Sequence, residues 1–210
     1  MANGKSSMLY LLEVMHKPID LSGIRLITVS GRIGAGSTSL AKHIAQILHW
    51  KHLEGGEIFW EALRHKMNVS AKDTNLRPDE EDVLFDDKLK EILSEDDHIV
   101  LETKLAGFFS QGVEGVFRVG VVCDNAEGED QKEIRIDRLV NREHISVHDA
   151  KAEVLEREAN DLEKWRSLYV KGDPNWIYWK KDYFDLIINT YSHDQDESLE
   201  LVLKAIGYKH

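Results

Sequence analysis

The chain has 210 residues, enough for a single domain that buries about 70% of its extended-chain surface. Its composition, 42% hydrophobic and 31% charged, is ordinary for a globular protein. The formal net charge of −11 argues against a general nucleic-acid or membrane-surface binder, because those proteins need a basic face, whereas a small anionic ligand with Mg²⁺ is still compatible. A single cysteine, Cys123, excludes an internal disulfide and predicts a reducing, cytoplasmic location.

Residues 1–23 precede the first predicted strand, and we expect them to form an N-terminal helical extension that Ser7 could cap. Glu13, Lys17 and the shortness of the apolar run exclude a secretion signal. No apolar run in the chain approaches the roughly 18 residues of a membrane span. We therefore predict a packing helix rather than a partner-binding arm.

The stretch Ile24–Trp50 combines a strand, a glycine-rich turn and a helix. Its first six residues are an apolar, β-branched run that predicts a buried parallel strand. After Gly31, Gly34 and Gly36, apolar residues over 40–48 recur at helical spacing. In such a turn, successive backbone N–H groups converge on an anion at the N-terminus of the helix.

The turn matches the phosphate-loop pattern G-x-x-x-x-G-K-[ST] at every fixed position except one. Gly31, Gly36 and Thr38 are in place, whereas Ser37 stands at the lysine position. Thr38 is the expected Mg²⁺ ligand. The pattern thus predicts a phosphate-binding loop that keeps its backbone N–H donors but lacks the lysine ammonium group that would contact the β- and γ-phosphates. The alternative is a strand–helix turn that binds nothing.

The next segments predict a shorter strand and two helices. Lys51–Trp60 is typical of a strand, a glycine turn and a helix that continues to about Met67, and a loop follows over Asp73–Asp79. A second helix begins at Asp79 or Glu80. We expect its acidic run to be a solvated face rather than a metal site.

Two later apolar runs predict buried strands that end in acids. His98–Glu102 resembles a Walker B strand, whose acid orients the hydrated Mg²⁺ at the C-terminal edge of the sheet. Phe117–Asp124 repeats the pattern, with Asp124 as the rival acid. An ordinary strand-end carboxylate is the alternative interpretation of Glu102.

From residue 131 the pattern becomes helical and basic. Arg135, Arg138 and Arg142 are spaced by three and four residues and lie on one helical face, and Arg157 follows on a second helix. Surface pairing with neighbouring acids is the alternative for any single arginine. Three aligned arginines in a phosphate-loop chain favour a mobile lid, about residues 127–160, that neutralises transferring phosphate charge.

The second helix runs roughly from Val147 to Tyr169. Lys171–Tyr183 is an aromatic loop, for which we expect hydrophobic packing rather than stacking on a base. Asp185–Thr190 predicts the last strand and Glu197–Ile206 a closing helix. Alternating strands and helices indicate an α/β protein with a parallel sheet covered on both faces.

From about Ile24 to Ile206 the chain resembles the cytidylate kinases, particularly the short archaeal-type branch of the nucleoside monophosphate kinases. The segments that carry the resemblance are VSGRIGAGSTSLA, EGGEIF, IVLETKLAGFF, IRIDRLVNREHIS and DLIINT. It implies a P-loop kinase fold, with a five-stranded parallel sheet, helices on both faces and a helical lid, in one domain over 24–210. It also implies transfer of the γ-phosphoryl of ATP to CMP or dCMP with Mg²⁺, with nucleotides as partners and neither nucleic acid nor membrane.

The resemblance implies binding roles for three segments. The first corresponds to the ATP phosphate loop, Gly31, Arg32, Gly34, Ala35, Gly36, Ser37 and Thr38. Gly56 begins the monophosphate-binding helix. Lys104 and Gly107 lie in a segment written LEGRLAG in the family, whose arginine contacts the monophosphate.

Further roles concern catalysis and the metal. Arg138 and Arg142 match lid arginines and Arg157 matches an arginine on the following helix, so these three are the predicted catalytic residues. Thr38 and Glu102 are the predicted metal ligands.

The departures from the family pattern remove or weaken cationic contacts. Ser37 replaces a lysine, Trp60 replaces an arginine, and Lys104 keeps the charge of an arginine without its bidentate fork. Arg32 and Arg64 are the predicted substitutes. The first hypothesis is an ATP:(d)CMP phosphotransferase. The alternative, favoured by the departures, is a catalytically weak or inactive kinase-like nucleotide-binding protein that acts through a partner.

Overall fold

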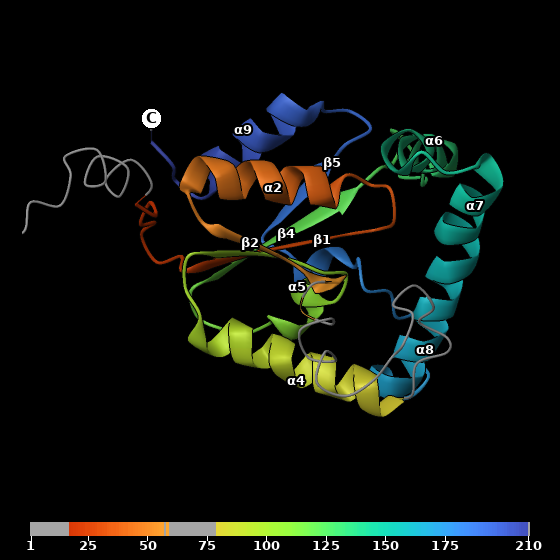
Figure 1. The fold of residues 1–210 in the computed structure, drawn as a ribbon, viewed down its shortest axis with the longest axis horizontal. Helices are drawn as coiled ribbons and strands as arrows, with labels where there is room; N and C mark the ends of the chain where they lie inside the picture. Colours follow the sequence, from red (N-terminus) through yellow and green to blue (C-terminus); the bar gives the residue numbers. More distant parts are fainter. Residues whose placement is uncertain (1–16, 57, 59–78, 210) are drawn as a thin grey trace, which may run out of the picture.

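The structure is a computed structural model that describes residues 17–56, 58 and 79–209 (Figure 1). The predicted N-terminal helix, and most of the helix expected to continue to Met67, lie outside the described residues, as do Trp60 and Arg64. In the described part of the chain, no helix combines the length and the apolar character that crossing a membrane requires.

The described residues form one five-stranded sheet in the order β2-β3-β1-β4-β5. Every neighbouring pair is parallel, which confirms the predicted sheet. The strands are β1 (Leu26–Gly31), β2 (Lys51–Glu54), β3 (Ile99–Glu102), β4 (Val116–Val122) and β5 (Leu186–Asn189). Because the chain leaves the central strand β1 toward one side of the sheet and later returns to the other, the C-terminal end of β1 is a topological switch point, where open α/β sheets bind ligands.

Helices cover both faces of the sheet, as Figure 1 shows. The helices α2 (Ser37–Leu48) and α9 (Gln195–Ala205) lie on one face, and α4 (Asp79–Glu95) and α5 (Ala106–Phe109) lie on the other. Each face has its own apolar cluster. Burial on both faces explains why β1 is a continuous apolar run rather than an alternating one.

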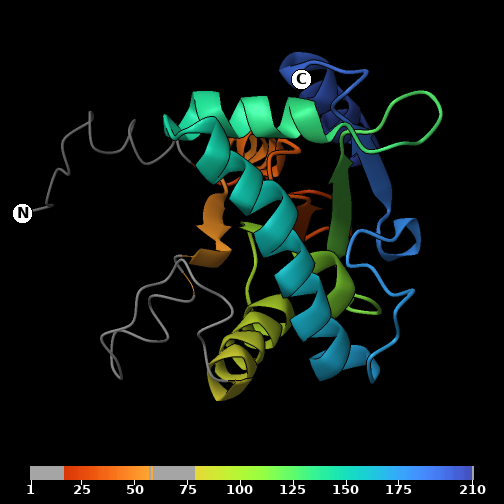
Figure 2. The same ribbon diagram turned by 90° about the vertical axis from the view of Figure 1, so that its right-hand side faces the viewer.

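An arm of helices follows β4. The helix α6 (Lys132–Glu143) crosses one end of the molecule, and α7 (Val147–Lys151), the π-helical η2 (Ala152–Arg157) and α8 (Glu158–Val170) descend from it as one long helix (Figure 2). The predicted helix over 147–169 is therefore confirmed, with a π-helical stretch inside it. Such stretches often mark functional positions.

The aromatic loop after α8 contains the short 3-10 helix η3 (Lys181–Tyr183). Trp176 and Tyr178 are buried in a cluster with Trp165 of α8 and Leu105. The prediction that this loop packs as hydrophobic structure is confirmed.

The first turns of α4 differ from the prediction of a solvated acidic face. Glu81, Asp82 and Asp86 are buried, whereas Val83 and Leu84 are 48% and 46% exposed. The prediction is wrong for these turns. These turns differ because Asp82 and Asp86 face partners on α8, described below, while Leu89, Ile92 and Leu93 further along the helix are buried in the core.

Candidate functional site

The phosphate loop joins the C-terminal end of β1 to α2. Gly36 caps α2 in a left-handed conformation (φ 106°), no side chain caps the helix, and its first turn contains no acidic residue. The amides at this helix N-terminus therefore stay available to an anion, which the helix dipole also favours. Gly34 has φ +76°, and a Cβ on it would lie 2.4 Å from the carbonyl oxygen of Arg135. Only glycine fits this contact between the loop and α6.

Glu102, at the end of β3, binds both hydroxyl groups at the start of α2. Thr38 Oγ1 donates to Glu102 Oε1 at 2.7 Å, and Ser37 Oγ donates to the same oxygen at 3.0 Å. Glu102 Oε2 is buried, lies 3.5 Å from His52 Nε2, and has no hydrogen-bond partner within the described residues. Glu102, and not the rival acid Asp124, therefore faces the loop, and Ser37 brings it a hydroxyl instead of a positive charge.

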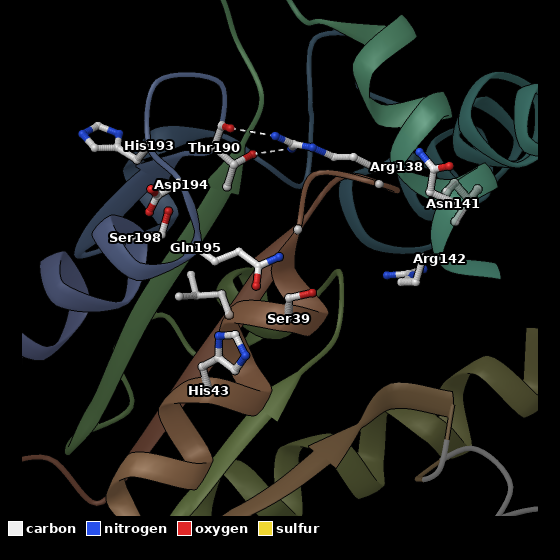
Figure 3. A pocket seen from close by; sticks show the side chains of 14 residues that line it. Ser39, His43, Arg138, Asn141, Arg142, Thr190, His193, Asp194, Gln195 and Ser198 are labelled. Atoms are coloured by element: carbon white, nitrogen blue, oxygen red, sulfur yellow. Dashed lines mark hydrogen bonds between the residues drawn. The ribbon is translucent and has the colours of Figure 1, made fainter. Parts of the chain in front are cut away.

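The three arginines predicted to be catalytic occupy different positions. Arg142 Nη1, from the last turn of α6, lies 3.5 Å from Thr38 Oγ1. Arg157, at the end of η2, lines the same space above the loop. Arg138 turns away from that space, and its guanidinium donates to the hydroxyl and the carbonyl of Thr190, each at 2.7 Å (Figure 3).

Arg32 and Arg135 form a buried ion cluster with Asp130 and Glu158, here called the four-charge cluster. Arg32 Nη1 lies 3.1 Å from Asp130 Oδ2, and Arg135 Nη2 lies 2.8 Å from the same oxygen. Arg32 Nε donates to Glu158 Oε1 at 3.0 Å, and Arg135 Nη1 donates to Oε2 at 3.1 Å. Burial would raise the pKa of Glu158, but the two guanidinium groups hold it below its ordinary value.

This cluster bears on the predicted role of Arg32. Its charge is matched by two carboxylates, and its guanidinium carbon lies 4.2 Å from the centre of the Trp179 ring. Arg32, the predicted substitute for the missing lysine, is therefore paired with carboxylates in this structure and brings no unpaired positive charge to the loop. Arg135, predicted on the same helical face as Arg138 and Arg142, is fully buried in the cluster.

Three cavities follow one another along this edge of the molecule. The α2–α9 cavity, about 530 Å³, is bounded by Gly34, Gly36, Ser39, His43, Arg138, Arg142, Thr190 and Gln195, among others. The loop cavity, about 470 Å³, lies above residues 31–38 and shares Gly34, Gly36, Leu139 and Arg142 with the first. The α4–α8 cavity, about 240 Å³, shares Glu54, Gly56, Glu102, Thr103, Lys104 and Arg157 with the loop cavity.

The remaining predicted residues divide between these cavities and the core. Lys104 and Gly56 line both the loop cavity and the α4–α8 cavity. Lys104 Nζ lies 2.6 Å from Asp161 Oδ2, and burial lowers the pKa of Lys104 while Asp161 opposes that change. Gly107 is instead packed against Phe184, since a Cβ on it would lie 2.2 Å from that ring. The structure does not bring Gly107 to the three cavities.

Ala35 also has a local role. It is fully buried, and its carbonyl accepts a hydrogen bond from the Thr190 hydroxyl at 2.7 Å. Through this contact and Arg138, the segment after β5 is bonded to the phosphate loop.

Sequence reasoning missed much of the lining of the two outer cavities. Figure 3 shows His43 on α2, Asn141 on α6 and Gln195 on α9 around the α2–α9 cavity. Asp82 and Asp86 of α4 line the α4–α8 cavity. None of these residues belongs to a short motif. The signal that was present for α4 was the acidic run itself, which we interpreted as solvated.

The chain is similar in sequence to archaeal cytidylate kinases. No protein-family model matches the chain. The sequence is 31% identical over 185 residues to the cytidylate kinase of Haloarcula marismortui, covering 86% of this chain and 88% of the relative. It is 28% identical over 186 residues to the cytidylate kinase of Archaeoglobus fulgidus, covering 87% and 95%.

Solved structures resemble the fold. The shikimate kinase of Bacteroides thetaiotaomicron matches with a TM-score of 0.56 at 17% identity, covering 87% of this chain and 98% of that one. An uncharacterized protein from Eubacterium ventriosum matches with a TM-score of 0.64 at 13% identity, covering 88% and 99%. At such low sequence identity these structural matches support the P-loop kinase fold and do not identify a substrate.

Proposed function

The chain belongs to the cytidylate kinase family, and from this premise we propose that it transfers the γ-phosphoryl group of ATP to CMP or dCMP. The observation that supports this most strongly is the succession of three cavities with the phosphate loop beneath the middle one. Phosphoryl transfer needs a donor and an acceptor aligned on opposite sides of the migrating group. Two outer cavities that each share lining residues with a central one above helix-terminal amides fit that requirement.

The α2–α9 cavity is the proposed site of the donor nucleoside. It adjoins Gly34 and Gly36, so a triphosphate chain starting there would run over the loop amides toward Thr38. Arg138 lines this cavity, and its predicted role therefore becomes binding of the donor rather than contact with the migrating group.

Mg²⁺ fits between the loop and β3. The Thr38 hydroxyl and the Glu102 carboxylate are adjacent, and one buried oxygen of Glu102 is left without a hydrogen-bond partner among the described residues. Among those residues no group of three or more His, Cys, Asp or Glu side chains could hold a metal. Such a sparse protein contribution suits Mg²⁺, which keeps waters and takes phosphate oxygens. When bound, Mg²⁺ would neutralise charge on the β- and γ-oxygens.

The chain's own cations carry the rest of the proposed mechanism. Lys104 and the Gly56 segment would hold the acceptor phosphate at the junction of the loop cavity and the α4–α8 cavity. Arg142 and Arg157 would neutralise charge on the migrating group from the proposed lid, about residues 127–160. No strong general base is needed, because the acceptor is already an anionic phosphate oxygen.

An ADP-release assay with ATP–Mg²⁺ and CMP, dCMP, UMP or AMP tests the proposal. The parent chain should release ADP with CMP or dCMP, and Ser37→Lys should turn over faster, since one preorganised donor contributes about 10²–10³ in rate. Ser37→Ala, which removes the hydroxyl without adding charge, is the matched control. No ADP release from either the parent or Ser37→Lys would overturn the proposal.

The alternative is a kinase-like protein that binds nucleotide and acts through a partner. Ser37 at the lysine position favours it. Thermal unfolding distinguishes the two, because a ligand at 100-fold its dissociation constant adds about 2.7 kcal/mol to stability whether or not it reacts. Stabilisation by ATP–Mg²⁺ without ADP release would support this alternative.

A further inference from the structure

We propose that Asp86, with Asp82 beside it, selects the acceptor base by accepting a hydrogen bond from an exocyclic amino group. The α4–α8 cavity would then take a base such as cytosine and reject one with a keto oxygen in that place, such as uracil. This inference rests on the proposed function, because it assigns the acceptor base to that cavity.

The α4–α8 cavity has two chemically different ends. The end that it shares with the loop cavity contains the cations Lys104 and Arg157. The lining that it does not share contains three carboxylates, Asp82, Asp86 and Asp161, and three aromatic side chains. These aromatic residues are Phe85, Trp165 and Tyr169. A ligand that fits has an anionic group at the loop end and a flat group with hydrogen-bond donors at the α4 end.

Asp82 and Asp86 are held in place by α8. They lie four residues apart on one face of α4, and both are at least nine-tenths buried. The Tyr169 hydroxyl donates to Asp86 Oδ2, and Lys164 Nζ lies 2.5 Å from Asp82 Oδ2. Because these bonds fix the two carboxylates, their orientation in the cavity wall is defined, unlike that of two carboxylates exposed to solvent.

Burial of these acids is unfavourable unless donors reach them. The pKa of Asp86 is raised from 3.8 to about 6, mainly by desolvation; Asp82 and Asp87 also raise it, while Tyr169 and Lys90 lower it. The cavity lining also contains a buried acceptor oxygen on Asp161. The buried Asp161 bonds to Lys104 through Oδ2, whereas its Oδ1 has no hydrogen-bond partner in the described part of the chain.

The chemistry of the base explains the selection. The N4 amino group of cytosine donates to a carboxylate, whereas the O4 of uracil would set one acceptor against another. A buried acceptor left without a donor is strongly disfavoured, and sites built around a hydrogen bond reject analogues that lack it. The aromatic walls would stack on either pyrimidine, so they add affinity without adding discrimination.

Competition between CMP and UMP tests the inference. The parent should prefer CMP in kcat/KM, and Asp86→Asn should reduce the CMP-to-UMP ratio about tenfold to a hundredfold, because the amide can also donate to O4. Asp87→Asn, the next residue along α4 with a largely exposed carboxylate, is the matched control and should keep the parent ratio. Tyr169→Phe, which removes only the hydroxyl that orients Asp86, should lower the ratio by a smaller factor.

Calorimetric titration of the same variants with CMP and UMP separates this inference from the proposed function. If the chain binds CMP over UMP and Asp86→Asn removes the preference, the inference holds even where no turnover is detected. Equal binding of CMP and UMP by the parent would overturn it, and so would an unchanged ratio in a folded Asp86→Asn variant. Turnover of CMP in those cases would leave the proposed function intact.

Discussion

Replacement of Glu158 by glutamine is a direct test of the four-charge cluster. Glu158 is the first residue of α8 and is buried between Arg32 of the phosphate loop and Arg135 of α6. With Asp130, the cluster contains two positive and two negative charges. Glu158→Gln keeps the volume of the side chain but leaves one guanidinium charge uncompensated, and Arg135 is fully buried.

The expected loss of stability follows from this burial. Removing one partner of a buried ion pair typically destabilises a protein by about 3–5 kcal/mol. Arg32 and Asp130 retain some exposure and can relax toward water, so we expect the lower end, about 3 kcal/mol. For a domain of this size, that corresponds to a fall in Tm of roughly 6–12 °C.

Urea unfolding of the parent, Glu158→Gln and the exposed control Glu156→Gln measures the effect. Because the folded-state pKa of Glu158 is depressed, its contribution to stability is present above the ordinary pKa of 4.5 and is lost as the pH falls through the folded-state value. The gap between parent and variant should therefore be largest at pH 7 and shrink in acid. Equal midpoints for parent and Glu158→Gln at pH 7, or a gap that stays constant into acid, would refute the reasoning.

Three further predictions concern single residues. Gly34→Ala should destabilise the fold by about 1–3 kcal/mol and weaken ATP binding, because the loop must move away from the α6 backbone, and urea unfolding with calorimetry would measure both. Asp86 has a folded-state pKa raised from 3.8 to about 6, so its favourable contribution is complete below 3.8 and is lost as the pH rises. Relative to the parent, the free energy of unfolding of Asp86→Asn should therefore rise by about 1–3 kcal/mol from pH 4 to pH 7, as measured by urea unfolding. The absence of such a rise would contradict the raised pKa. Arg142→Ala should lower kcat about 10²–10³-fold with an unchanged Tm, since this side chain is 45% exposed, and a parallel fall in Tm would show a structural role instead.

The features that local sequence encodes were predicted well. The phosphate loop is a strand, a turn and a helix in one contiguous stretch, and the pairing of Thr38 with a strand-end acid follows from sheet topology. Doubly buried strands are visible as apolar runs, so the parallel sheet was also predictable. The family resemblance added the number of strands.

The errors have a common physical origin in contacts between distant segments. The acids of α4 were expected in solvent, but their partners Lys164 and Tyr169 lie about 80 positions later in the chain. Arg32 is the predicted substitute for the missing lysine, yet Glu158, more than 100 positions away, pairs with it. Helical spacing placed Arg138 on the same face as Arg142 but could not show that its guanidinium binds the segment after β5. A charged side chain in a single sequence gives no sign of the partner that fixes its direction.

Serine at the lysine position changes where the positive charge above the loop comes from. Among the described residues lining the loop cavity, the cations are Arg32, Lys104, Arg142 and Arg157. Arg32 is paired with two carboxylates, while Lys104 is paired with Asp161, Arg142 with Glu143 and Arg157 with Glu153. The other three belong to elements outside the loop, so their distance from bound phosphate depends on how those elements sit. A lysine in the loop would place its positive charge next to the bound phosphates whatever the position of α6 and η2. In this chain, charge neutralisation would instead be completed only when α6 and η2 lie over the loop, as they do in this structure, and transfer would depend more strongly on that closure than in a kinase that retains the lysine.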